Sequence, residues 1–547
     1  MKTVFFILCI ALVTGLECQA QILPKEGDSL HYNQVLFKVP LTPGASNYHF
    51  TVVKDGSKDM IISEQAENRA VIISGLEFGA SYTWNVTATN TKGEILKEYD
   101  PAHFVIRFTK WSDTRRYRYR VNGASDEEDL LLFDYGRIAV NRKGEAVWTM
   151  PNFDFVDSLQ LLRDLNQTES GTFTCILGGN PAEFDRDGKI IWKAPKQPIR
   201  PGSPNNFYHH DLEKLPNGNY MVCGSEFLDR VSPEGDTVEV EFGTLIEFDK
   251  DNNIKWRWTS STYFTDEDVF RLPKKEGEWQ VRAHLNSFSA HGNRIFAGFR
   301  DADRIIEIDK RTKRVVRSYG GWGATKEPNS NTHFFRKQHA SELISDGNLA
   351  VLNNDSIQLA GRVSSIIIFS QLKNSKSKIV WKFPLDFDNL TDGKAMKTGN
   401  IEEQENGNIL VNAGTLNRCF EVTRNKKVVF DMFMEQYDYK QKDWIPFPQY
   451  RVHECTSLYP IAFGSTILNP ESKWNQTIHY KISNIGSSSD SYIIEGYKDG
   501  RVYRRYISNT VDAGDSVVLP IATNGAKIDK IITRSVTSEE EEVNVLN

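Results

Sequence analysis

The chain has 547 residues, which is too long for one ordinary domain and enough for two or three. Hydrophobic residues make up 39% and charged residues 25%, the balance of a soluble globular protein. The net charge of −6 gives no reason to expect a nucleic-acid partner, and the aromatic content of 11% favours β-structure.

The N-terminus has the pattern of an export signal. Lys2 precedes an apolar run from Val4 to Val13, and the small residues Cys18 and Ala20 suit cleavage near Ala20. The run is far shorter than the ~20 residues needed to span a bilayer, and no later segment is apolar enough to do so. We therefore predict a signal peptide over residues 1–20, a periplasmic or secreted protein, and no stable membrane insertion. A lipid anchor on Cys18 is the alternative.

Export would leave four widely spaced cysteines, Cys175, Cys223, Cys419 and Cys455. Their spacing excludes a zinc ribbon and a Cys-x-x-Cys redox motif. Disulfides are permitted outside the cytoplasm, so disulfides and buried free thiols both stay open.

The first block, residues 21–107, contains four short segments with the alternation of strands, 37–39, 48–53, 70–73 and 82–87. Turn residues separate them. The run from Leu76 to Trp84 resembles the leucine, glycine and tyrosine pattern of a fibronectin type III sandwich. We predict an N-terminal β-sandwich.

Residues 108–458 contain a repeated strand–turn–strand element. Its six copies run over 141–148, 185–192, 249–256, 309–316, 373–381 and 423–430. Six such units fit a six-bladed β-propeller with about four strands in each blade, and a large sandwich is the alternative. Helical periodicity is nearly absent, and only Asp266–Phe270 and Ser158–Leu165 are predicted as short helices.

The tail, residues 459–547, is predicted to form a small C-terminal β-sandwich-like domain. Strands are expected at 477–482, 492–497 and 516–521. The acidic run 539–542 reads most simply as a solvated terminal segment.

Three histidines occupy the same place in three repeats. His210, His284 and His339 each lie eight residues before the glycine of a Gly-Asn turn, and the fourth such turn has Gly399 there. The innermost strand of each blade lines a shared central funnel, so the constant offset aims three imidazoles at one point. Alternation along a strand predicts that the neighbouring His209 points the other way.

The return strands of the same hairpins add polar groups. Eight residues after the turn glycines lie Arg300 and Thr415, and the equivalent positions elsewhere hold Glu226 and Asp355. Three imidazoles could bind zinc, but Arg300 beside them argues against a cation. A guanidinium among imidazoles suits an anion, whose oxygens accept hydrogen bonds. We expect no metal and no cofactor. A packing histidine copied with the repeats is the structural alternative.

Three motif blocks carry a family resemblance. They are His210-Asp211…Leu215-Pro216-Asn217-Gly218-Asn219, His284-Leu285-Asn286-Ser287 and Gln338-His339-Ala340…Asp346-Gly347-Asn348. They resemble the blocks of the bacterial arylsulfate sulfotransferases, over roughly residues 105–440. The family is periplasmic, has six-bladed propellers with an N-terminal sandwich, and uses no nucleotide sulfate donor.

The resemblance implies a role for each site residue. His339 matches the nucleophile that becomes sulfated on nitrogen, His210 and His284 match the histidines that bind the sulfuryl group, and Asn286 matches a substrate-binding Asn. Arg300 matches the family arginine, although Phe299 stands where a Ser is usual, and Thr415 is placed by position alone. The closely spaced cysteine pair of well-known members is absent here.

The resemblance implies an aryl-sulfate sulfotransferase with small-molecule partners, an aryl sulfate donor and a phenolic acceptor. His339 would attack sulfur and a second phenol would collect the group, a ping-pong reaction. His210 and His284 are both open as proton donor. The oligomeric state is open too, with a homodimer among the alternatives. A non-catalytic propeller that binds glycans or sulfated ligands and a metal-dependent hydrolase or lyase are the competing interpretations.

Overall fold

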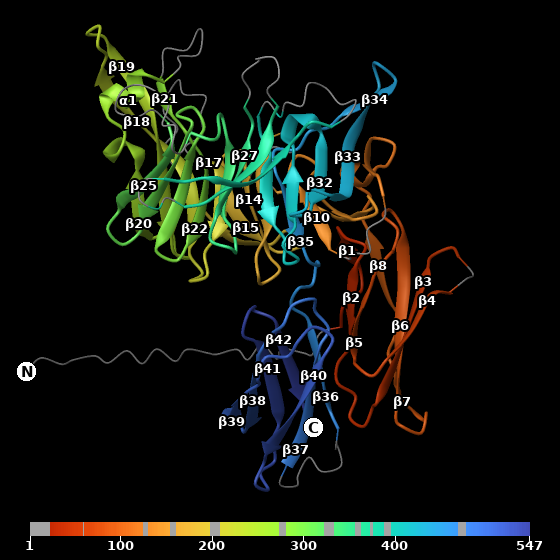
Figure 1. Cartoon of the computed structure of the whole chain (residues 1–547). Helices are drawn as coiled ribbons and strands as arrows, with labels where there is room; N and C mark the ends of the chain where they lie inside the picture. The colour runs from red at the N-terminus through yellow and green to blue at the C-terminus, as the bar shows by residue number, and fades with distance from the viewer. Residues whose placement is uncertain are drawn as a thin grey trace, which may run out of the picture.

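The computed structural model shows a nearly all-β protein, as predicted (Figure 1). It describes residues 22–546 except for 58–59, 124–128, 154–159, 197–207, 273–280, 322–332, 356–362, 372, 374–375, 388–394, 396 and 469–476. The predicted signal peptide therefore lies outside the described residues. Within them, no helix has the length and apolarity to cross a membrane.

The central part of the chain forms a six-bladed β-propeller, which confirms the predicted architecture. Each blade is an antiparallel sheet, and the first strands of neighbouring blades contact one another around the axis. From the inner to the outer edge, blade 1 is β35 (Val452–Cys455), β10 (Leu130–Phe133), β11 (Ile138–Asn141) and β12 (Ala146–Thr149). Blade 2 is β13 (Leu162–Gln167), β14 (Phe173–Leu177), β15 (Asn180–Phe184) and β16 (Ile190–Lys193).

Blades 3 to 6 follow the same order, with additions at two of them. Blade 3 is β17 (Tyr208–Lys214), β18 (Tyr220–Val231), β19 (Thr237–Phe248) and β20 (Ile254–Thr259), with β21 (Val281–Ala283) beside β19. Blade 4 is β22 (Leu285–His291), β23 (Arg294–Phe299), β24 (Arg304–Asp309) and β25 (Arg314–Gly320). Blade 5 is β26 (His339–Leu343), β27 (Leu349–Asn353), β28 (Ser365–Phe369) and β29 (Ile379–Pro384). Blade 6 is β30 (Asn400–Glu403), β31 (Ile409–Asn412), β32 (Arg418–Val422), β33 (Val428–Asp438) and β34 (Asp443–Pro446), with β9 (Tyr117–Val121) on β33.

The ring is closed by strands from both ends of the propeller segment. β35 comes last in the segment and pairs with β10 of blade 1, while β9 comes first and pairs with β33 of blade 6. The six predicted strand–turn–strand copies are hairpins, and in each blade they join the third and fourth strands. The four Gly-Asn turns join first and second strands, so the predicted histidines do lie at inner strands.

Repeated side chains tie each blade to the next. Three tryptophans of the repeat donate through Nε1 to a backbone carbonyl on the following blade's hairpin: Trp148 to Arg186, Trp256 to Lys310 and Trp381 to Arg424. Near the axis, buried carboxylates accept hydrogen bonds from backbone N–H groups of the next inner strand. Asp164 accepts from Leu212, and Asp211 accepts from Phe288. These bonds satisfy buried backbone groups and fix the blades around the funnel.

The first block forms two layers. One sheet has the order β1 (Asp28–Leu30), β8 (Ala102–Ile106), β6 (Ser81–Thr89), β3 (Asn47–Lys54) and β4 (Met60–Ala66), with β7 (Ile95–Glu98) on β6. The pair β2 (Val35–Lys38) and β5 (Ala70–Ile73) packs on it, where Phe37 meets Trp84 and Phe104 edge to face. The likeness to fibronectin type III stays a prediction.

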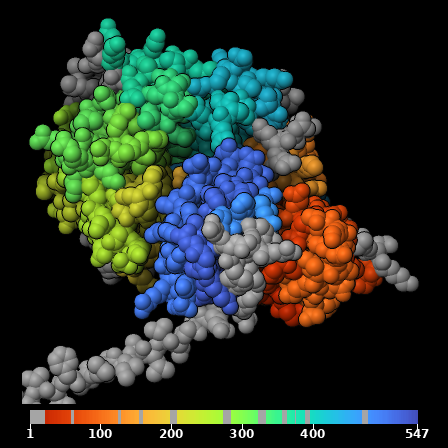
Figure 2. Space-filling view, turned by 90° about the horizontal axis from the view of Figure 1, so that it is seen from below, coloured from red at the N-terminus to blue at the C-terminus, as the bar shows by residue number. Residues whose placement is uncertain are grey.

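The tail also forms two sheets. They are β36 (Phe463–Ile467), β37 (Thr477–Asn484) and β40 (Ser516–Ala522), and β39 (Arg501–Ile507), β38 (Tyr492–Lys498), β41 (Lys530–Ser535) and β42 (Glu541–Val545). This C-terminal unit lies beside the N-terminal block under the propeller (Figure 2). The prediction that the acidic run 539–542 is solvated was wrong at its end, because Glu542 is buried against Arg69 of the N-terminal block.

Helix is confined to single turns, at η1 (Lys110–Ser112), η2 (Ser260–Thr262), α1 (Asp266–Phe270) and η3 (Gly414–Leu416) in the described residues. The predicted helix at Asp266–Phe270 is confirmed, and Thr265 caps it. The predicted helix over Ser158–Leu165 was wrong: Leu162 onward is strand β13, because β14 satisfies its backbone. The four cysteines are buried free thiols.

Candidate active site

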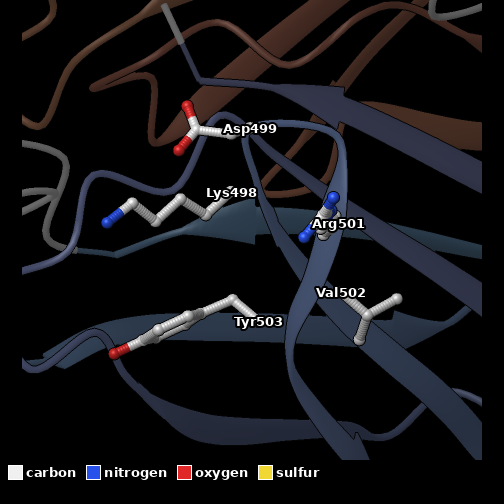
Figure 3. Close-up of a pocket in the computed structure, with 5 residues that line it drawn as sticks. All are labelled: Lys498, Asp499, Arg501, Val502 and Tyr503. Carbon is white, nitrogen blue, oxygen red and sulfur yellow. The ribbon is translucent and has the colours of Figure 1, made fainter.

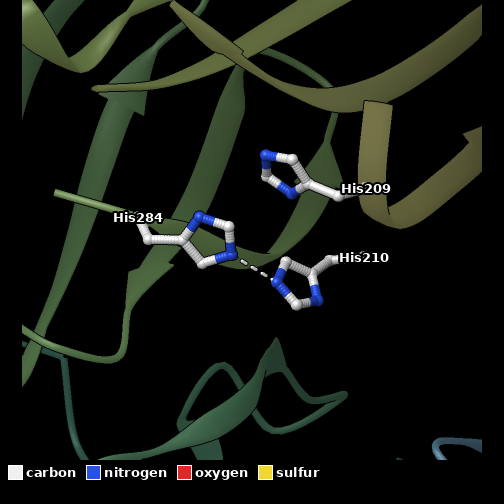
Figure 4. Close-up of side chains that lie close together, drawn as sticks. All are labelled: His209, His210 and His284. Carbon is white, nitrogen blue, oxygen red and sulfur yellow. Dashed lines mark hydrogen bonds between the residues drawn. The ribbon is translucent and has the colours of Figure 1, made fainter. Parts of the chain in front are cut away.

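The predicted histidines converge at one end of the propeller axis. His210 lies on β17, His284 just before β22, and the two Nε2 atoms are 2.5 Å apart (Figure 4). His339 opens β26, the inner strand of the next blade, which packs against β22. The funnel therefore brings together imidazoles from three successive blades.

His209 belongs to the cluster, contrary to prediction. Its ring centroid lies 4.5 Å from that of His284 and 4.9 Å from that of His210. The cause is a β-bulge in β17, where His210 has a φ of +65° and the pairing with β18 shifts between Tyr208 and Leu212. An inserted residue cancels the two-residue alternation on which the prediction relied.

Bulges recur at the funnel end of the inner strands. β13 shifts register between Arg163 and Asn166, β22 between Leu285 and Ser287, and β26 between His339 and Ser341. Ala340 has a φ of +45°, which is unusual for a residue with a Cβ. The repeated bulge aims side chains at the axis that a regular strand would place in the blade interior.

Asn354 fixes the tautomer of His339. Its amide nitrogen donates to the carbonyls of Ala395 (2.7 Å) and Thr398 (3.1 Å), so its oxygen faces His339 Nδ1 at 2.6 Å. An amide oxygen only accepts, so Nδ1 carries the proton and Nε2 holds the lone pair. Burial lowers the pKa of His339 to about 3, with Arg300 and Arg451 contributing, so the ring is neutral at neutral pH.

Glu241 anchors the other side of the cluster. It is fully buried on β19, accepts from Ser225 Oγ at 2.6 Å and lies 2.8 Å from His284 Nδ1. β21 pairs with this part of β19 and leads directly to His284, which explains the contact. Ser225 Oγ also meets His209 Nε2 at 2.8 Å.

Arg300 reaches the funnel as predicted. Leu285 pairs with Phe299 at one end of the β22–β23 hairpin. His284 directly precedes Leu285 and Arg300 directly follows Phe299, so both lie at that end. Arg300 bonds Asp301 at 2.9 Å, and Lys337 approaches Asp301 at 3.4 Å. Arg300 and Lys337 thus place two positive side chains beside Asp301.

Two predicted residues lie differently. Asn286 is buried, and its Nδ2 donates to the carbonyl of Gln338 at 2.9 Å, immediately before His339. Thr415 is exposed on η3 of blade 6. Asn286 is thus placed to hold the strand that carries His339.

Three imidazoles have the geometry that a metal ion could use. His209, His210 and His284 each offer a ring nitrogen within 4.8 Å of the others, and Glu241 supports one of them as a carboxylate supports a zinc ligand. However, the Nε2 atoms of His210 and His284 are bonded to each other, and Arg163 and Arg300 add positive charge to this region. The set fits an anion better than a cation.

A separate pocket lies on the C-terminal unit, at the β38–β39 turn (Figure 3). Its lining is Lys498, Asp499, Arg501, Val502 and Tyr503. It contributes nothing to the histidine cluster.

A family comparison covers the propeller. The model of the family described as Arylsulfotransferase (ASST) matches residues 132–457, well over half of the chain. The chain belongs to the arylsulfotransferase family. This match supports arylsulfotransferase activity in general, and it contains every residue of the histidine cluster in this arylsulfotransferase.

No curated protein matches this arylsulfotransferase. Among solved structures, a Bacteroides caccae protein of unknown function has 13% identity and a TM-score of 0.37, covering 62% of this chain and 100% of that one. A streptogramin B lyase has 13% identity and a TM-score of 0.29, covering 72% and 96%. Kuenenia stuttgartiensis hydrazine synthase has 9% identity and a TM-score of 0.30, covering 55% of this chain and 99% of that one. These scores are too low to bear on function.

Sequence reasoning missed several members of the site. Tyr450 bonds His210 Nδ1, and Arg163 lies over the Tyr450 ring at 5.7 Å. Tyr450 precedes the closing strand β35, which is outside the repeat count. Glu241 sits in the long β18–β19 hairpin and Asn354 follows β27, so neither shares the histidine offset. The polar run Asn353-Asn354-Asp355 at the end of the apolar strand β27 was the available signal for Asn354.

Proposed function

We propose that this arylsulfotransferase moves a sulfuryl group from a phenolic sulfate ester to a phenolic acceptor through a sulfohistidine on His339. The observation that carries the proposal is the bond between Asn354 and His339 Nδ1. It leaves the Nε2 lone pair of a neutral imidazole in a funnel that already holds two more imidazoles and Arg300. That combination is a nucleophile beside an anion-binding group.

In the first half-reaction, His339 Nε2 attacks sulfur in line with the ester oxygen. The S–O bond breaks and its electron pair stays on the ester oxygen of the departing phenol, while His210, His284 and Arg300 bind oxygens of the sulfate ester. In the second half-reaction a phenol attacks the same sulfur and the N–S bond breaks, a ping-pong cycle. Each oxygen-binding donor contributes about 10²–10³ in kcat in sites of this kind.

The other predicted residues take supporting roles in the proposal. Asn286 holds Gln338 and so positions His339, and Thr415, exposed on η3, is assigned to substrate binding by its position in the repeat. No nucleotide sulfate and no cofactor enter the cycle. The signal-like N-terminus supports action outside the cytoplasm.

The test is transfer from 4-nitrophenyl sulfate. Nitrophenol release should depend on added phenol and should be lost in His339→Ala, with the melting temperature retained. His291→Ala is the matched control, because His291 is an exposed histidine at the far end of β22. Full activity in His339→Ala would refute the nucleophile.

The imidazole set within 4.8 Å favours one second candidate, a metal-dependent hydrolase or lyase. This candidate expects loss of activity with a chelator and recovery with zinc. The sulfotransferase proposal expects chelator to leave the rate unchanged.

A further inference from the structure

A continuous hydrogen-bonded chain runs from Tyr450 to Glu241 through two imidazoles. Tyr450 Oη bonds His210 Nδ1, His210 Nε2 lies 2.5 Å from His284 Nε2, and His284 Nδ1 lies 2.8 Å from Glu241. The chain runs from the closing loop to blade 3, crosses to the start of blade 4 at His284, and returns to blade 3 at Glu241. Its far end is a fully buried carboxylate.

Chemistry fixes the direction of every bond in this chain. Glu241 as a carboxylate only accepts, so His284 Nδ1 carries a proton and the Nε2 of a neutral His284 is an acceptor. His210 Nε2 must then carry the proton between the rings. Its Nδ1 is left as an acceptor for the Tyr450 hydroxyl. One proton therefore lies between the two Nε2 atoms.

A sulfate ester cannot bind both imidazoles in that state. Its oxygens are acceptors only, so both Nε2 atoms must donate and the pair is one proton short. We propose that the site takes up one proton together with an anionic substrate, that this proton resides on His284 Nε2, and that Glu241 is the positioning residue that makes the uptake favourable. This inference rests on the proposed function.

The surrounding charges select His284 over its neighbours. Burial first, then the nearby imidazoles and Arg163, holds the pKa of His210 well below its usual range, and burial lowers that of His209 to about 3. Only His284 has a carboxylate on its other nitrogen. Asp301 also interacts electrostatically with His284. Asp301 itself is paired with Arg300 and Lys337.

Glu241 is suited to remain ionised throughout. Burial on its own would raise its pKa, but the charge and hydrogen bond of His284 bring the value down to about 2. The carboxylate therefore stabilises an imidazolium without accepting the proton itself.

In the reaction, the proton taken up on binding protonates the leaving oxygen. When the S–O bond breaks, the phenolate oxygen gains the electron pair and His284 Nε2 gives it the proton. His284 returns to the neutral form, and a neutral phenol leaves. In the second half-reaction the acceptor phenol gives its proton to His284 Nε2 as its oxygen attacks sulfur, so no proton is gained or lost over the cycle.

The direct test is titration calorimetry with 4-methylbenzenesulfonate, whose C–S bond replaces the ester linkage. Binding is measured in buffers of different ionisation enthalpy across about pH 5–8, the range in which an imidazole changes charge. The expected result is uptake that approaches one proton per site. Glu241→Gln should abolish the uptake and weaken binding about 10- to 100-fold, while Glu241→Asp should retain uptake.

Glu226→Gln is the matched control, because Glu226 lies on the same hairpin but bonds Thr259, Ser261 and Arg257 instead of a histidine. It should behave as the unmodified protein. No binding, binding without proton uptake, or equal uptake in Glu241→Gln would overturn the inference. Because the sulfonate is not transferred, binding-linked uptake can hold even if His339 is not the nucleophile, so the two proposals fail separately.

A kinetic readout separates positioning from mere folding. Loss of the proton donor should slow phenyl sulfate more than 4-nitrophenyl sulfate, because nitrophenolate leaves without proton transfer more readily. An equal slowing of both substrates by Glu241→Gln would contradict the assigned role.

Discussion

At the residue scale, the two ring nitrogens of His339 differ in protonation and in contacts. Asn354 holds Nδ1–H of His339 and so presents Nε2 to the funnel. The orientation of Asn354 itself comes from two backbone carbonyls, those of Ala395 and Thr398. The tautomer of the proposed nucleophile is thus set by a residue that does not touch substrate in the proposed cycle.

Removing this acceptor should impair chemistry more than folding. Asn354→Leu is expected to lower kcat about 10- to 100-fold, as the loss of an orienting partner does at comparable histidines. Asn353→Leu is the control, since Asn353 is equally buried but bonds Arg336 and Ser365. Equal losses of kcat in the two variants, measured with 4-nitrophenyl sulfate, would argue against a tautomer role.

The pKa of His339 gives a second prediction at this scale. Burial lowers it to about 3, so the ring stays neutral as the pH falls well below the usual histidine value of about 6.5. The kcat/KM profile should therefore show no acid limb near pH 6.5. If kcat/KM does fall with a midpoint near pH 6.5, the same profile is measured for variants that lack His210 or His284. A fall that persists in both variants would contradict the prediction that His339 is neutral.

At the element scale, the inner-strand bulges decide what reaches the funnel. Repeat spacing predicted the blades, both hairpin types and the common end shared by His210, His284, His339 and Arg300. It failed at His209, because a bulge depends on how two strands pair and leaves no mark in residue spacing. Tyr450 was missed for a related reason: ring closure brings it in from outside the repeats.

The role of the bulge at Ala340 can be tested with substitutions that differ in their backbone preference. Ala340 has a φ of +45°, a region that glycine enters freely and β-branched residues resist. Ala340→Gly should keep the melting temperature and activity close to those of the unmodified protein. Ala340→Val should lower both, because straightening β26 would move His339. Intact activity in Ala340→Val would show that the bulge does not set the site.

At the scale of the whole molecule, a buried ionic cluster joins the two small β-units. Arg69 of the N-terminal block pairs with Glu542 and donates to Asn544 (2.9 Å) and the carbonyl of Ser465 (2.8 Å) of the C-terminal unit. Lys38 also approaches Glu542, at 3.4 Å. Sequence alone predicted a solvated acidic run there, because the contact depends on a domain that lies far away along the chain.

Breaking this cluster should destabilise the protein without altering the funnel. Glu542→Leu leaves Arg69 buried without its partner, which typically costs about 3–5 kcal/mol. The double variant Glu542→Leu/Arg69→Met should recover much of that loss. Thermal unfolding measures both, and the transfer rate of the folded fraction should not change. No change in unfolding for Glu542→Leu would show that the interface contributes nothing.

The sulfohistidine is tested most directly by mass spectrometry of the protein quenched during turnover with 4-nitrophenyl sulfate. The account predicts that the peptide containing His339 gains about 80 Da, the mass of a sulfuryl group on the nucleophile, and loses it when phenol is added before the quench. Phenol-dependent nitrophenol release with the added mass on another residue, or with none on His339, would contradict it.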